Sequence, residues 1–163
     1  MPHIPPPVAA VGAALAQRAL SGGGRPPGGG RAAVAATVTL ASASLAASAA
    51  SRFRRSGTTL DPLQPDQAAV LVTSGANAIT RNPIYVGLTG LLLAHAAWRG
   101  SWAALLPVVG FVAFIDRTQI RVEEAALFEK FGAAYEAYQA DSPRWVDQRS
   151  LASLPRLLGQ QWS

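Results

Sequence analysis

Two short segments of this chain carry polar and charged residues whose types and spacing could support binding or catalysis. The first is "TRNPIYVG" (80–87), which places Arg81, Asn82 and Tyr85 directly before a long apolar run. The second is the acidic pair Glu123-Glu124, in a chain whose first acid comes only after residue 60. Guanidinium, amide, phenol and carboxylate groups all make directional hydrogen bonds, and two of them carry charge. The simplest interpretation is that Arg81 anchors a membrane span and Pro83 begins its helix. A binding or catalytic role for these groups depends on the rest of the chain.

Residues suited to covalent or metal chemistry are scarce. The chain has no cysteine, which excludes disulfides, thiolate metal sites and a cysteine nucleophile. Its two histidines, His3 and His95, are far apart in sequence, so we expect no metal site. The glycine-rich stretch 21–31 lacks the Gly-Lys-Ser/Thr ending of a phosphate loop, and no dinucleotide fingerprint follows a predicted strand. What remains is binding, or a reaction that depends on positioning and electrostatics.

The acidic pair falls in a stretch with helical periodicity (116–140), where Tyr135 and Tyr138 are expected to serve packing. Adjacent side chains on a helix point in directions about 100° apart, so Glu123 and Glu124 cannot face the same point. One of them can face the "TRNPIYVG" segment while the other is solvated. Spacing alone favours a simpler interpretation, in which both are surface acids.

The elements that must position these groups are apolar helices. The chain is 50% hydrophobic and 14% charged, against about 25% charged residues in a typical soluble domain. Apolar runs cover 32–50, 84–98 and 102–115, and a shorter one at 8–20 is marginal for a span. The tight "RGS" connection (99–101) predicts a helical hairpin. We therefore expect an all-α, multi-pass transmembrane protein with about four spans, in which 68–75 is a re-entrant or interfacial segment.

The distribution of basic residues predicts the orientation in the membrane. Fourteen residues are basic and the net charge is +5, but the arginines flank apolar runs, so a membrane is favoured over nucleic acid as partner. The richer side would be cytoplasmic by the positive-inside rule, and holds Arg52, Arg54, Arg55, Arg81, Arg117, Arg121, Lys130 and Arg144. Arg25, Arg31 and Arg99 would lie on the other side. This predicts a multi-pass protein of the cell (inner) membrane whose polar segments face the cytoplasm.

Three linked motifs resemble the isoprenylcysteine carboxyl methyltransferase and phospholipid methyltransferase families, including their bacterial members. They are "GTTLDPLQPDQAAVLVTSG" (57–75), "RNPIYVG" (81–87) and "VEEAALFEKFGAAYEAYQADSPRW" (122–145). The resemblance covers at least residues 52–146. It implies one membrane-embedded domain over 1–163, with N-terminal spans and linker (1–50), a motif-bearing core (51–146) and a tail (147–163). The C-terminal hairpin and a cytoplasmic amphipathic helix would form the pocket.

The same resemblance implies S-adenosylmethionine as the methyl donor. The positions that match the motifs, and would therefore line its site, are Leu71, Val72, Asn77, Asn82, Pro83, Tyr85 and Glu123. Asn77 stands where the family has a tyrosine. Glu124 would support the helix. Gln119 stands where eukaryotic relatives carry a substrate-contacting arginine, so Arg117 or Arg121 would take over contact with the substrate.

The acceptor implied by the resemblance is a lipophilic or lipidated molecule that enters from the bilayer. Carboxyl O-methylation of an isoprenylcysteine-like group is the first expectation, because a carboxylate is its own nucleophile and needs no base from the protein. N-methylation of a phospholipid amine is the alternative within the enzyme class. A third alternative is a non-catalytic membrane protein that retains the scaffold.

Overall fold

The computed structural model describes residues 4–22, 26–55 and 70–159, and within these ranges it contains helices and turns but no strand. The all-α class predicted from the sequence is confirmed. The described residues divide into two compact units, one within 1–44 and 87–119 and the other within 45–86 and 120–163. The expectation of a single domain is not tested by this division and stays a prediction.

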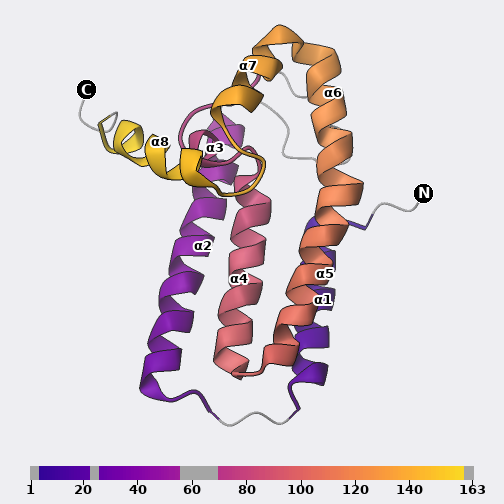
Figure 1. Ribbon diagram of the computed structural model, residues 1–163, viewed down its shortest axis with the longest axis vertical. Helices are drawn as coiled ribbons and strands as arrows, with labels where there is room; N and C mark the ends of the chain where they lie inside the picture. The colour runs from indigo at the N-terminus through magenta and orange to yellow at the C-terminus, as the bar shows by residue number, and fades with distance from the viewer. Residues whose placement is uncertain (1–3, 23–25, 56–69, 160–163) are drawn as a thin grey trace. The chain divides into compact units, whose positions relative to one another are not determined.

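Unit 1 contains α1 (Pro6–Leu20), the first part of α2 (Gly29–Arg55), most of α4 (Pro83–Arg99), the 3-10 turn η2 (Trp102–Ala104) and α5 (Leu105–Ile115). Helix α1 begins on prolines, which are tolerated in a first turn because their missing N–H would be unpaired there anyway. It packs against α5, as Figure 1 shows, and against η2. Leu92, Phe111 and Ile115 are buried in this unit.

A buried glutamine ties the helices of unit 1 together. Gln17 is fully buried, and its Nε2 donates hydrogen bonds of 2.9 Å to the carbonyl oxygens of Leu92 and Ala104. Its Oε1 lies 2.8 Å from Nδ1 of His95. One polar side chain of α1 is therefore satisfied by three groups from α4 and η2, which fixes the register of these elements.

Unit 2 contains the last part of α2, the short helix α3 (Ala76–Ile79), the first residues of α4, and then α6 (Arg121–Phe131), α7 (Ala133–Asp141) and α8 (Gln148–Gly159). Helix α3 packs on α8. A π-helical segment, Asp116–Ile120, joins α5 to α6. The prediction of one helix over 116–140 is wrong at Gly132, which has a positive φ of 49° and ends α6.

Two helices in the described part of the chain are long and apolar enough to cross a membrane, Gly29–Arg52 and Trp102–Phe131. Helices α1 and α4 have 15 and 17 residues, fewer than the roughly 20 that a straight span needs. Two candidate spans are thus supported where the sequence predicts about four.

Candidate functional site

The segment before α4 is held by the C-terminal part of unit 2. Thr80, which is fully buried, donates from Oγ1 to the carbonyl oxygen of Arg144 at 2.9 Å, and Asn82 donates from Nδ2 to the same oxygen at 3.0 Å. The backbone N–H of Arg81 donates to the carbonyl oxygen of Pro143 at 2.8 Å. Three consecutive residues are thereby fixed by two residues about sixty positions later.

The side chains of Arg81, Glu124 and Arg144 form a nearly buried ionic cluster. Glu124 Oε1 accepts from Arg81 Nη2 at 2.9 Å and from Arg144 Nε at 3.1 Å, and Glu124 Oε2 accepts from Arg144 Nη2. The Arg81 and Glu124 side chains are only 11% and 12% exposed, whereas that of Arg144 is 34% exposed. Arg81 Nη1 also donates to the carbonyl oxygens of Gln139 (3.1 Å) and Ser142 (2.7 Å). Glu124 therefore supports the helix, as the resemblance implies.

The neighbouring carboxylate contacts a different residue of the same segment. The Tyr85 hydroxyl donates to Glu123 Oε1 at 2.5 Å, and Glu123 is partly exposed while Tyr85 is buried. Both acids contact the "TRNPIYVG" segment, so the interpretation of both as surface acids is wrong; Glu123 keeps partial exposure, whereas Glu124 is nearly buried. The two side chains point in different directions, but "TRNPIYVG" is long enough to present a partner to each: Arg81 to Glu124, and Tyr85 to Glu123.

Two tyrosines of α7 are buried in unit 2. Tyr135 and Tyr138 are 1% and 6% exposed, with ring centroids 6.1 Å apart in an edge-to-face arrangement. Burial, reinforced by the Glu124 carboxylate, raises the pKa of Tyr135 to about 12. Burial also raises the pKa of Tyr138, whose hydroxyl donates to the carbonyl oxygen of Asn77 at 2.8 Å. Both residues pack, as the sequence predicts.

Asn77 carries a polar atom that no described residue satisfies. Asn77 is 3% exposed, and its side-chain Oδ1 is buried without a hydrogen-bond partner in the described part of the chain. A buried acceptor left unpaired costs about 1–3 kcal/mol. A ligand that donates a hydrogen bond at this position would offset that cost.

The remaining predicted site residues are placed as follows. Leu71 and Val72 are half-buried in the turn that precedes α3, and Pro83 is buried at the start of α4. Arg121 is exposed at the start of α6, two residues before Glu123. Arg117 is exposed in the π-helical segment and belongs to unit 1, whereas all the other predicted site residues belong to unit 2. The described residues contain no cluster of three or more metal-ligating side chains.

Sequence reasoning missed the roles of Thr80, Arg81 and Arg144. Arg81 was predicted to mark the end of a span, because an arginine before an apolar run is the usual membrane anchor. Charge balance could have indicated these roles. Two adjacent acids on a helix favour nearby cations, and the motif stretches "RNPIYVG" and "SPRW" supply Arg81 and Arg144. Chemically, the cluster buries the Glu124 carboxylate between two guanidiniums, while the Glu123 carboxylate is partly exposed and hydrogen-bonded to the phenol of Tyr85.

Comparison with known proteins agrees with this geometry. The family model described as phospholipid methyltransferase matches residues 31–134, which include "RNPIYVG" and the acidic pair. An uncharacterised protein of Haemophilus influenzae is 38% identical over 63 residues, which cover 39% of this chain and all of that protein. No solved structure matches the chain. The matched family is grouped in one clan with the isoprenylcysteine carboxyl methyltransferases, and its methyltransferases use S-adenosylmethionine. The chain belongs to the phospholipid methyltransferase family, a family of membrane methyltransferases.

Proposed function

We propose that this protein transfers a methyl group from S-adenosylmethionine to a lipophilic acceptor in the membrane. The observation that carries the proposal is the hydrogen bond between Tyr85 and Glu123, because it unites two of the three motifs. The ionic cluster supports it, since it joins Arg81 of the second motif to Glu124 and Arg144 of the third.

The residues of unit 2 suit this cofactor in two respects. Its ammonium and sulfonium are cationic and favour a nearby anion, and Glu123 is a partly exposed carboxylate beside the site. Its amine and hydroxyl groups are donors, and Asn77 Oδ1 is a buried acceptor without a partner in the described chain. Leu71, Val72, Asn82, Pro83 and Tyr85 would complete the wall. When bound, the cofactor supplies an electrophilic methyl group on sulfur.

Glu123 would hold the ammonium or ribose end of the cofactor. An anion that binds the sulfonium itself would stabilise the charged ground state more than the transition state, in which that charge is being lost, and would slow the step. The Tyr85 hydroxyl, as donor to Glu123, would fix the direction of the carboxylate.

The acceptor is proposed to be a carboxylate on an isoprenylcysteine-like lipid. A carboxylate oxygen can form the new carbon–oxygen bond with its own electron pair, while the electrons of the broken sulfur–carbon bond remain on sulfur, and no proton has to move. Arg121, exposed two residues before Glu123, would pair with such a carboxylate, and Arg117 is the second candidate for this contact.

N-methylation of a phospholipid amine is the second candidate, favoured by the family whose model matches. A protonated amine must lose a proton before it can attack, and Glu123 or water would have to accept it. Membrane embedding with about four spans, and a site that faces the cytoplasm, are part of either proposal. The two candidate spans support it.

The test is S-adenosylmethionine binding to detergent-solubilised protein by calorimetry, followed by transfer of a labelled methyl group in lipid. We expect binding that weakens at least about ten-fold in Glu123→Gln, since a lost charge-assisted hydrogen bond is worth roughly 1.5–3 kcal/mol. Base-labile label would identify an ester and base-stable label an amine. No binding to folded protein, in lipid as well as detergent, would contradict the proposal and favour a scaffold without catalysis.

A further inference from the structure

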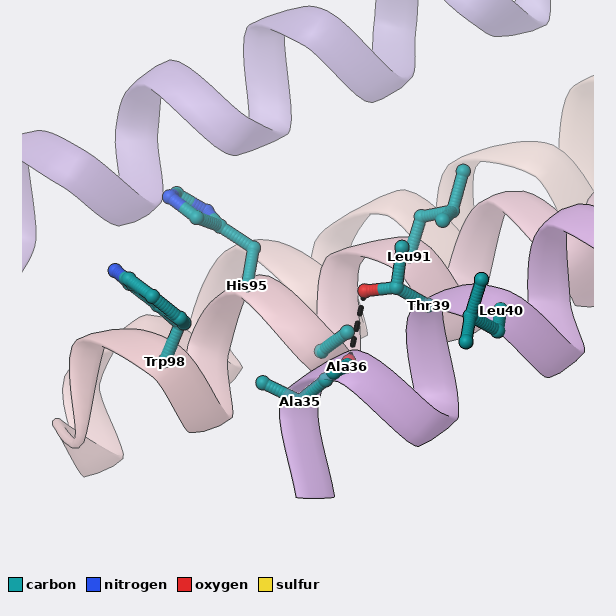
Figure 2. Close-up of a pocket in the computed structure, with 8 residues that line it drawn as sticks. Ala35, Ala36, Thr39, Leu40, Leu91, His95 and Trp98 are labelled. Atoms are coloured by element: carbon teal, nitrogen blue, oxygen red, sulfur yellow. Dashed lines mark hydrogen bonds between the residues drawn. The ribbon is translucent and has the colours of Figure 1, made fainter. Parts of the chain in front are cut away.

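A groove runs between α2 and α4 and is formed entirely by residues of unit 1. Its volume is about 620 Å³, which is within the range of small-molecule sites. Figure 2 shows the rings of His95 and Trp98 extending from α4 beside the α2 segment that bears Ala35 and Thr39. The helices touch near one point of this interface, where a side chain in place of Gly90 would overlap Ser42. The lining includes Ala35, Ala36, Leu40, Leu91, Ala94 and Trp98.

The wall of the groove offers mostly hydrocarbon and aromatic surface. Thr39 Oγ1 donates to the carbonyl oxygen of Ala35 at 2.8 Å, so its hydroxyl is satisfied within α2 and its methyl remains available for contact. His95 is held through Nδ1 by Gln17. Leu40 and Trp98 are 69% and 49% exposed, so these apolar side chains are open to an occupant. Such a surface suits an alkyl chain.

Two guanidiniums flank the end of α4 that carries Trp98. Arg31 lies one helical turn before Ala35, and its guanidinium occupies the space that a side chain at Gly100 would need; Gly100 has a φ of 61°. Arg99 donates from Nη2 to the carbonyl oxygen of Gly22, and its Nε is buried without a partner among the described residues.

The charge at this end is uncompensated within unit 1. The sequence ranges of the unit contain a single acid, Asp116, against five arginines. Neither Arg31 nor Arg99 is paired with a carboxylate in the described part of the chain. Trp98 and the 87% exposed Trp102 flank the same turn, as tryptophans do at the headgroup level of a bilayer.

We propose that the α2–α4 groove binds an anionic phospholipid that is not the methyl acceptor. One acyl chain lies between Ala35 and Trp98, and the phosphate contacts the guanidiniums of Arg31 and Arg99. Charge complementarity selects this occupant. Two guanidiniums without a carboxylate partner in the described residues favour a phosphate whose headgroup carries no positive charge of its own. The inference rests on the membrane embedding of the chain and is independent of methyl transfer.

The test is native mass spectrometry of the full chain in detergent, titrated with dioleoyl phosphatidylglycerol or with dioleoyl phosphatidylcholine. We expect one tightly bound phosphatidylglycerol and weaker binding of phosphatidylcholine. The affinity for phosphatidylglycerol should fall roughly five-fold for Arg31→Gln or Arg99→Gln alone and roughly thirty-fold for both. Ala36→Leu, an exposed position that lines the groove, should also weaken binding by filling it.

Arg54→Gln is the matched control, because it removes the same charge from an exposed position of α2 that belongs to unit 2. It should leave lipid binding unchanged. Equal affinity for the two lipids, insensitivity to the double arginine variant, or insensitivity to Ala36→Leu would each overturn the proposal. Soluble glycerol phosphate that displaces the lipid at equal concentration would also overturn it, since the acyl chain would then contribute nothing. S-adenosylmethionine binding, measured on the same variants, should be retained, so that failure here is distinct from failure of the proposed function.

Discussion

Glu123 and Glu124 are adjacent and chemically identical, yet the structure predicts that their substitutions by glutamine have opposite consequences. Glu124→Gln leaves the Arg81 guanidinium, 11% exposed, without its counter-charge. Breaking a buried ion pair costs about 3–5 kcal/mol. The lower end applies here, because Arg81 keeps two carbonyl acceptors and Arg144, at 34% exposed, regains water. We therefore expect a loss of about 3 kcal/mol.

In a thermal unfolding experiment this loss corresponds to a fall in Tm of about 6–12 °C for a chain of this size. Glu123→Gln keeps an acceptor for the Tyr85 hydroxyl and should cost about 1 kcal/mol, hence about 2–4 °C. Calorimetry on the folded fraction should show the reverse order, with S-adenosylmethionine affinity reduced by Glu123→Gln and retained by Glu124→Gln.

The comparison between the two variants is decisive, because each controls for the other. A fall in Tm below about 2 °C for Glu124→Gln would refute the claim that its ion pairs organise the segment. Equal losses of stability in both variants, with cofactor affinity unaffected in either, would refute the division of roles between the two acids.

Three further outcomes are expected from other parts of unit 2. Tyr85→Phe removes the donor that orients Glu123 and should raise the Kd for S-adenosylmethionine roughly five-fold, by calorimetry, in a protein that still folds. Gly132→Ala has open space for its Cβ but a φ of 49°, so thermal unfolding should show a loss of about 1–3 kcal/mol, whereas Gly12→Ala inside α1 should be neutral or stabilising; equal effects would contradict the backbone argument. The folded pKa of Tyr135 lies above that of the unfolded chain, so its contribution to stability is present below pH 10 and is lost as the pH rises towards 12. Tyr135→Phe should remove up to about 3 kcal/mol of that decline, and an unchanged decline would exclude this residue as its origin.

The helices could be predicted from sequence, but their ends and internal breaks could not. Apolar runs locate α2, α4 and α5 because burial or lipid contact imposes hydrophobicity along the whole run. Helix α2 continues to Arg55, beyond the predicted limit at residue 50, since arginines are favourable in a last turn. The break at Gly132 depends on a backbone angle that the surrounding helical pattern does not reveal.

The residues of the candidate site could be predicted from motifs, but their partners could not. The acidic pair and "RNPIYVG" are recognisable, whereas the Arg81–Glu124 pairing joins positions 43 residues apart and depends on the tertiary fold. Gln17 shows the same limit in unit 1: in sequence it only weakens an apolar run, and its burial makes sense only beside Leu92, His95 and Ala104. Local patterns predict elements, and long-range hydrogen bonds have to be observed.

The bonds from Thr80 and Asn82 to the carbonyl oxygen of Arg144 set an order of events during biosynthesis. A ribosome that adds about 5–20 residues per second completes Arg144 roughly 3–13 s after Arg81. Until Arg144 is made, Thr80 and Asn82 lack the carbonyl oxygen that later holds them, and Arg81 lacks the Glu124 carboxylate for the first 43 residues of that synthesis. Helix α4 is therefore complete before its polar start is satisfied, and the segment 80–82 is fixed only when the C-terminal segment folds back.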